Sequence, residues 1–264
     1  VQYMDNPQFL YHYTDLESLI LILKNRTIRL KSLDQLDDKE ESRFENFRAA
    51  AKYIFVSSWT EEEKESIPFW KMYTRDMHGV RIKLPLDPFK KCPYHGAQPF
   101  RKEQTAFVFS LPSEQTGGVP YDIFPISEKS FFYPVEYTED EKKLSCKLVD
   151  REKGKQSLHL EKAGVYKRTA WDFQKEWRYR VAAIPAAGNL SEQTWGEKIL
   201  LERLKSGYEI PMRYMDLELE DDSMEAMEIV AGPKMTEGEF EILKMIVAAY
   251  LPAVRIEKSR LRIR

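Results

Sequence analysis

The sequence has few of the residues that build disulfide frameworks and metal centres. Its 264 residues include two cysteines, Cys92 and Cys146, and four histidines. Two cysteines are too few for a disulfide framework, and neither they nor the histidines have the spacing of metal ligands. We therefore expect no metal cofactor and no structural disulfides.

The chain also lacks an excess of charge of one sign and a long apolar segment. Forty-one basic and 43 acidic residues leave a formal charge of −2, so no global field attracts the protein to nucleic acid or to membranes. No apolar run approaches the roughly 18 residues of a membrane span, and no signal peptide opens the chain. We predict a cytoplasmic protein without a membrane partner.

Short apolar segments and helical stripes follow one another irregularly, which favours an α+β fold over a doubly wound sheet. Without internal repeats or low-complexity linkers, the chain is predicted to be a single domain over residues 1–264. The predicted strands are residues 9–13, 28–30, 53–59, 79–84, 106–109, 131–137, 177–184, 228–231, 254–256 and 261–263. The predicted helices are residues 67–73, 188–208 and 236–250, one that begins at Thr14, and a charged one that ends near Lys52.

Two of these helices carry recognisable start signals. The stretches Thr14–Glu17 and Thr236–Glu239 both have the capping-box pattern, a hydroxyl residue followed three positions later by glutamate. A third segment, Glu139–Glu161, is highly charged and weakly patterned. We predict that it is a helix or an inserted segment that covers a cleft.

The most informative stretch places a glutamine and a glutamate two positions apart, Gln174 and Glu176, at the start of an apolar strand. Because residues i and i+2 of a strand point to the same face, both side chains are predicted to project into the same space. A half-buried carboxylate costs free energy unless it is paired. The alternative to a functional role is therefore an ion pair with Arg178 or Arg180.

Three predicted strands carry unusual polar residues, in Tyr11–Thr14, Ser57–Thr60 and Gln174–Glu176. Taken alone, His12 is compatible with a structural histidine, and a serine pair at the end of a strand is typical of a turn. Taken together, the order of the three segments predicts one site that is assembled from three strand ends.

This order resembles the ADP-ribosyltransferase superfamily, with His12 on the first strand, Ser57, Ser58 and Trp59 at the middle motif, and Gln174 with Glu176 at the Glu/Gln-x-Glu motif. A second resemblance covers most of the chain and is to a widespread bacterial family, domain of unknown function 2971. The segments that carry it are Trp70–Tyr73, Gly79–Ile82, Phe173–Arg178 and Ile229–Lys234, with Leu36–Glu40 as a degenerate match to an Asn-Asp-Pro-like turn.

The superfamily resemblance implies a split mixed or antiparallel sheet and a site that cleaves the nicotinamide–ribose bond of NAD. Glu176 would stabilise the positive charge on the ribose in the transition state. His12 in its neutral form would bind the adenosine ribose, and the backbone of Tyr13 or Thr14 would hold the carboxamide. Ser57 would orient Glu176.

The resemblance also implies a stacking surface and an acceptor. Trp59, Trp70 or Tyr73 would stack on the cationic nicotinamide, although packing in the core is the alternative for each ring. A glutamine at position 174 resembles enzymes that modify asparagine or guanine, which favours a neutral acceptor, a protein side chain or a nucleobase, or hydrolysis of NAD.

Three functions are consistent with these patterns. The first is an NAD-consuming ADP-ribosyltransferase-like enzyme, for which family analogy implies a bacterial toxin or an antiphage effector. The second is a non-catalytic module of the same fold that binds a nucleotide or nucleic acid. The third is a nucleotide hydrolase.

Overall fold

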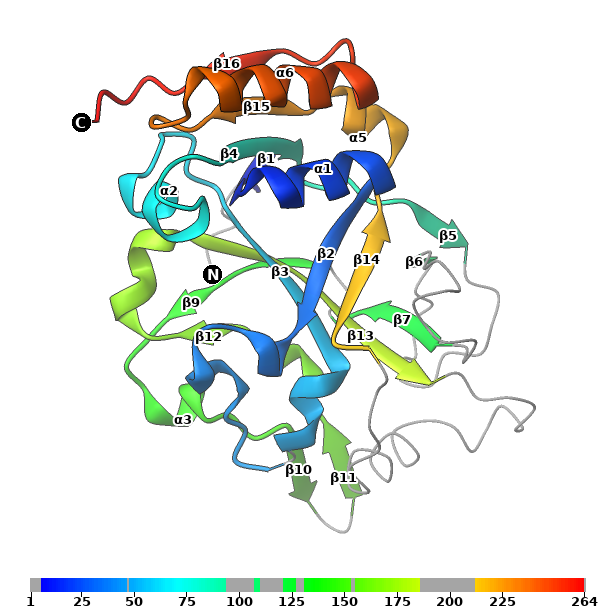
Figure 1. The fold of residues 1–264 in the computed structure, drawn as a ribbon. Helices are drawn as coiled ribbons and strands as arrows, with labels where there is room; N and C mark the ends of the chain where they lie inside the picture. The colour runs from blue at the N-terminus through cyan, green and yellow to red at the C-terminus, as the bar shows by residue number, and fades with distance from the viewer. Residues whose placement is uncertain are drawn as a thin grey trace.

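Strands from both ends of the chain meet in one mostly antiparallel sheet (Figure 1). This computed structural model describes residues 6–46, 48–93, 107–109, 121–126, 131–152, 155–185 and 212–263. Within these ranges the main path of the sheet is β14 (Tyr214–Glu218), β2 (Thr27–Ser32), β3 (Ile54–Thr60), β1 (Phe9–Thr14), β4 (Val80–Pro85), β15 (Glu228–Ala231) and β16 (Ile256–Lys258). The long strand β13 (Glu176–Pro185) pairs with β3 and also with β7 (Tyr121–Pro125) and β8 (Phe132–Pro134). The predicted α+β class is therefore confirmed.

The helices are short and lie next to the sheet. They are α1 (Leu16–Asn25), α2 (Ile67–Tyr73), α3 (Glu141–Leu144), α5 (Asp221–Glu225) and α6 (Glu237–Tyr250). Helices α1 and α6 lie beside each other in Figure 1, and Leu19, Leu23, Leu243 and Val247 share one buried cluster with the sheet. Burial of these apolar side chains on both sides of the contact is what stabilises the two short helices.

The capping predictions had opposite outcomes. Thr236 and Glu239 form the predicted capping box at the start of α6. The prediction for α1 was wrong, because Asp15 caps that helix and accepts a hydrogen bond from the backbone N–H of Ser18. Thr14 remains in β1, where it pairs with Val80 and is buried.

Several predicted elements differ from the structure. The charged helix before Lys52 is two 3₁₀ segments, Lys39–Ser42 and Arg48–Tyr53, because that stretch has no continuous apolar stripe to bury. Residues 131–137 are split between β8 and β9 (Glu136–Tyr137), and β9 pairs in parallel with β12 (Tyr166–Lys167). Residues 261–263 form no strand, since Leu261 and Ile263 pack instead on a small aromatic cluster.

The segment 139–161 is not one long helix. It contains α3 and a hairpin of β10 (Val149–Glu152) and β11 (Lys155–Leu158). Among the described residues, those that line the cavity lie elsewhere in the chain. A further strand pair consists of β5 (Lys91–Pro93) and β6 (Phe107–Phe109), and β6 lies within the strand predicted at 106–109. The helix predicted for 188–208 lies outside the described residues.

Two strands, β1 and β2, pair with different parts of the same edge of β3, and the sheet is split between them. Tyr11 of β1 pairs with Thr60, whereas Lys31 of β2 pairs with Val56. Both strands run antiparallel to β3, so β1 and β2 run in the same direction and diverge around α1. Between these two pairings, residues 57–59 have no ladder partner on this edge within the described ranges. On its other edge β3 pairs with β13 from Ile54 to Thr60.

A close backbone approach fixes the position of the loop after α2 and predicts a stability effect. A Cβ atom at Gly232 would lie 2.2 Å from the carbonyl oxygen of Met77 and 2.9 Å from that of Gly79. Backbone atoms cannot move aside as a flexible side chain would, so we expect Gly232→Ala to destabilise the protein by about 2 kcal/mol or more. Urea denaturation would measure this. Gly238→Ala is the control, because a Cβ there meets no atom within 4 Å; an equal loss in both variants would contradict the argument.

Candidate functional site

A cavity of about 400 Å³ lies at the gap between β1 and β2. It is lined by residues of β1, α1, β2, β3 and α2, and by the segment that leads into β13. Nine of the ten residues predicted for the site line it: His12, Tyr13, Thr14, Ser57, Ser58, Trp59, Tyr73, Gln174 and Glu176. The three polar segments therefore meet at one cavity, as the sequence predicts.

The side chain of His12 reaches from β1 to the stretch of β3 that has no ladder partner on this edge. Its Nδ1 lies 2.9 Å from the backbone carbonyl oxygen of Ser58, which is on the unpaired stretch of β3. A carbonyl oxygen only accepts, so Nδ1 carries the proton. Burial lowers the pKa of His12, and the charge of Lys31 lowers it further. The ring is therefore neutral at pH 7, with Nε2 left as an acceptor.

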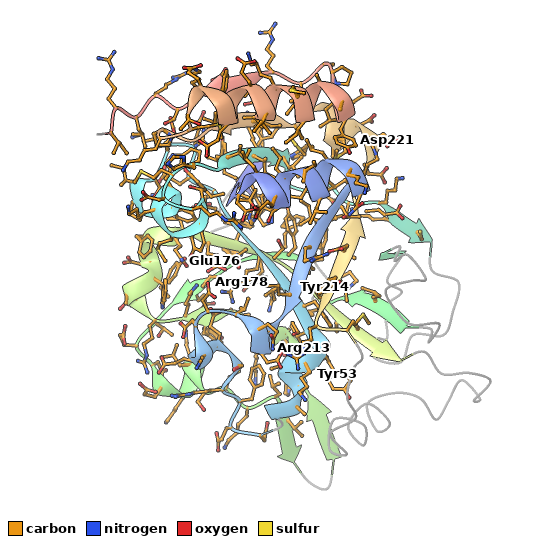
Figure 2. The ribbon with its side chains drawn as sticks, in the orientation of Figure 1. Tyr53, Glu176, Arg178, Arg213, Tyr214 and Asp221 are labelled. Atoms are coloured by element: carbon orange, nitrogen blue, oxygen red, sulfur yellow. The ribbon has the colours of Figure 1, made fainter. Side chains whose placement is uncertain are left out.

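Glu176 is buried inside the protein and is held by two cations. Its Oε1 accepts a hydrogen bond from Nε of Arg178 at 2.6 Å, and its Oε2 accepts one from Nζ of Lys167 at 2.9 Å. Only 4% of Glu176 is exposed, and Figure 2 shows it beside Arg178 in the interior of the molecule. The alternative of an ion pair with Arg178 is thus present in the structure, but it lies at the cavity wall and not on the outer surface.

A second buried carboxylate completes the cluster. Glu41 forms ion pairs with Arg178 and, at 3.5 Å, with Lys167. The group therefore contains two acids and two bases and is neutral as a whole. Arg180 takes no part in it, because its Nη1 donates to the backbone carbonyl oxygens of Glu161 and Ala163.

The cations decide the ionisation of Glu176. Burial by itself would raise the pKa of Glu176, but the positive charges of Arg178 and Lys167 and hydrogen bonds from Arg178 and Ser58 outweigh it and lower the pKa to about 2. The group is a permanent anion at physiological pH. It is therefore suited to stabilise positive charge and poorly suited to accept a proton as a general base.

Gln174 and Glu176 are close together, but not for the predicted reason. The strand begins only at Glu176; Gln174 ends a 3₁₀ segment, and Lys175 between them has left-handed backbone angles, with φ 40°. Alternation along a strand therefore does not apply. Lys167 joins the two side chains, because its Nζ donates to Oε1 of Gln174 at 2.8 Å as well as to Glu176.

Two further expectations about the site are corrected. Ser57 does not orient Glu176: its Oγ accepts a hydrogen bond from Nε1 of Trp59, and it pairs across the sheet with Tyr179. Ser58 pairs with Arg178, so Ser58 is the serine on the face of Glu176. Trp70 does not line the cavity; it is fully buried, contacts the ring of Tyr13 edge-on and donates its Nε1 proton to Glu65.

Three further residues that build the site were not predicted. Lys167, Glu41 and Trp171 line the cavity; Lys167 and Glu41 lie in segments without a strong pattern, whereas Trp171 lies three residues before Gln174. Lys167 is in the two-residue strand β12, and its Nζ lies 4.7 Å from the centre of the Trp171 ring. A buried glutamate needs a cationic partner, but nothing in the sequence indicates that Lys167 provides one.

Comparison of the sequence with protein-family models finds no matching family. Comparisons with curated proteins and with solved structures also find no match. No helix among the described residues is long and apolar enough to cross a membrane. Within the same ranges, no group of three or more histidine, cysteine, aspartate or glutamate side chains is arranged to hold a metal ion.

Proposed function

We propose that this protein is an NAD-consuming enzyme of the ADP-ribosyltransferase type, which transfers ADP-ribose to a neutral acceptor or to water. The observation that carries the proposal is the meeting of His12, Ser58 and Glu176, from three strands, at one cavity in the opened sheet. A volume of about 400 Å³ is within the range of roughly 300–1,000 Å³ typical of small-molecule sites.

Glu176 has the properties that cleavage of the nicotinamide–ribose bond requires. The bond breaks through an oxocarbenium-like state with positive charge on the ribose, and a fixed anion beside the sugar stabilises that state more than the ground state. Each carboxylate oxygen of Glu176 has one charged donor, and Ser58 supplies a further hydrogen bond to the carboxylate. The anion is held in place by its partners, so it does not need to reorganise during the reaction.

His12 is suited to bind a hydroxyl group. With Nδ1 donating to Ser58, the neutral ring presents Nε2 as an acceptor, and a ribose hydroxyl is a donor of matching chemistry. The ring is fixed on its other side by Trp59, whose centroid lies 4.9 Å away. This agrees with the interpretation of His12 as a ribose-binding residue.

The part-exposed aromatic rings at the cavity are the best candidates to stack on nicotinamide. Trp59 is packed between His12 and Tyr179 and is almost fully buried. Tyr73 and Trp171 are only partly buried and also line the cavity. A cationic pyridinium ring is attracted to such aromatic faces.

A nucleotide-binding module without catalysis is the second candidate, and the ion pairs favour it. The charge of Glu176 is matched by Lys167 and Arg178, which reduces the field that the carboxylate exerts on a sugar. The same arrangement would serve a protein in which the cluster only shapes a binding pocket. Both candidates use the same cavity, so turnover separates them.

The test is to incubate the protein with NAD, with and without protein and nucleic-acid acceptors, and to follow the release of nicotinamide by chromatography. We expect release by the wild type and a higher KM for His12→Ala, which loses the ribose contact. Trp70→Phe is the matched control, since Trp70 lies outside the cavity. Binding of NAD by calorimetry without any release would favour the module and contradict the enzyme.

A further inference from the structure

Three side chains at the cavity form a directed chain of hydrogen bonds. Nζ of Lys167 donates to Oε1 of Gln174 at 2.8 Å, and Nε2 of Gln174 donates to Oη of Tyr73 at 2.7 Å. Lys167 and Gln174 are buried, with 7% and 3% exposed, and Tyr73 is partly exposed at the cavity. The residues come from β12, from the 3₁₀ segment before β13 and from α2.

Lys167 determines the donor-to-acceptor direction of these hydrogen bonds. An ammonium group has donors only, so the amide atom that faces Lys167 must be the oxygen of Gln174. The amide nitrogen must then face Tyr73, and the tyrosine oxygen is the acceptor. The proton of the tyrosine hydroxyl therefore points away from Gln174.

This hydroxyl proton is retained at neutral pH. Burial, together with the negative charges of Glu176 and Asp37, raises the pKa of Tyr73 to about 12. Within the part of the chain that the structure describes, Oη of Tyr73 makes the single hydrogen bond to Gln174. The O–H group is thus an unused donor on the wall that also carries Glu176.

We propose that Tyr73 determines which groups dock beside Glu176, by donating its hydroxyl proton to an oxygen of the ligand. A carbonyl or hydroxyl oxygen accepts this hydrogen bond, whereas a guanidinium or ammonium group, which has donors only, leaves it unmade. This rests on the proposed function for the identity of the ligand, which is then the acceptor of ADP-ribose. Gln174 is a positioning residue that acts through Tyr73 and does not itself read the acceptor.

One substitution should reverse the direction of the hydrogen bond between residue 174 and Tyr73. In Gln174→Glu the carboxylate accepts from Lys167 and also from Tyr73, because a carboxylate has acceptors only. The tyrosine proton then turns away from the cavity, and its oxygen faces the ligand as an acceptor. A site that required an acceptor oxygen becomes one that requires a donor.

The experiment measures the binding of methylurea and methylguanidinium, probes of the same shape that differ by a carbonyl oxygen in place of a charged nitrogen. Neither probe carries an aromatic ring that could take the proposed nicotinamide position. Calorimetry or protein-observed NMR is carried out on the wild type, Tyr73→Phe, Gln174→Glu and the double variant. We expect methylurea affinity to fall about three- to tenfold in Tyr73→Phe, the value of one neutral hydrogen bond. A similar loss is expected in Gln174→Glu, with a gain for methylguanidinium.

The double variant is the decisive control. Methylurea is uncharged, so the charge added by Gln174→Glu affects it little. In the Tyr73→Phe background, Gln174→Glu should therefore change the affinity for methylurea less than twofold. An equal loss in both backgrounds, or no binding of methylurea by the wild type, overturns the inference. If the wild type prefers the carbonyl probe but releases no nicotinamide from NAD, the proposed function is wrong and this inference stands. If it releases nicotinamide but shows no such preference, this inference is wrong and the proposed function stands.

Discussion

Replacement of Glu176 by glutamine is expected to lower the rate of nicotinamide release by about 10²-fold or more. The substitution keeps the shape of the side chain and removes the charge that, in the proposed reaction, would face the ribose. Loss of one preorganised electrostatic contact typically costs a factor of this size in kcat. Because the contact is made in the transition state, kcat should fall more than KM rises. The measurement is steady-state release of nicotinamide from NAD.

The control must separate catalysis from folding. Glu176 is the partner of Arg178 and Lys167, so Glu176→Gln also weakens a buried cluster, and its thermal unfolding must be recorded before rates are compared. Glu241→Gln is the matched variant, since Glu241 is exposed and pairs with Lys244 at the surface. Turnover that survives Glu176→Gln in folded protein would place the chemistry on another residue.

Removal of Arg178 is expected to give the largest loss of stability, about 3–5 kcal/mol in the free energy of unfolding for Arg178→Met. That range is typical when one partner of a buried ion pair is deleted and the other charge is left uncompensated. Arg178 is 1% exposed and contacts both Glu41 and Glu176 as well as the carbonyl oxygen of Gly164. Without it, Lys167 alone faces two buried carboxylates. Urea denaturation measures the change.

A surface pair supplies the comparison. Arg26 pairs with Asp221 where both side chains are largely exposed, and Arg26→Met should cost less than about 1 kcal/mol. Adding Glu41→Gln to Arg178→Met removes the carboxylate charge that is left in excess of Lys167 and should recover part of the loss. If Arg178→Met were no more destabilising than Arg26→Met, the cluster would not be the buried, charge-balanced unit described above.

Local sequence signals predicted the elements that depend on nearby residues. The strands at β1, β3, β4 and β13, the helix α2 and the capping box of α6 all follow from short-range patterns. These signals gave a wrong prediction where two neighbouring residues could both serve as the cap of the same helix. Asp15 and Thr14 can both cap a helix, and only the pairing of Thr14 with Val80 in β1 selects Asp15.

The candidate site was predictable as a set of residues but not as a network. His12, Ser58 and Glu176 stood out because polar side chains at strand ends are unusual, and the structure brings them to one cavity. The roles assigned to Ser57 and Trp70 were wrong, because the register of β3 against β13 decides which serine faces Glu176. Register depends on contacts between segments more than 100 residues apart, as for the pairing of Trp59 with Trp177.

Sequence patterns were sufficient to identify part of the site: one acid, one amide, one histidine and several aromatic rings near the ends of strands. The tertiary structure alone decided their chemistry. Glu41 reaches the cluster from a segment far away in the chain. Lys167, together with Arg178, lowers the pKa of Glu176, and Lys167 also orients Gln174. Electrostatic interactions act through space in a poorly screened interior, so the state of a buried charge depends on neighbours whose distance along the chain gives no indication of their contact.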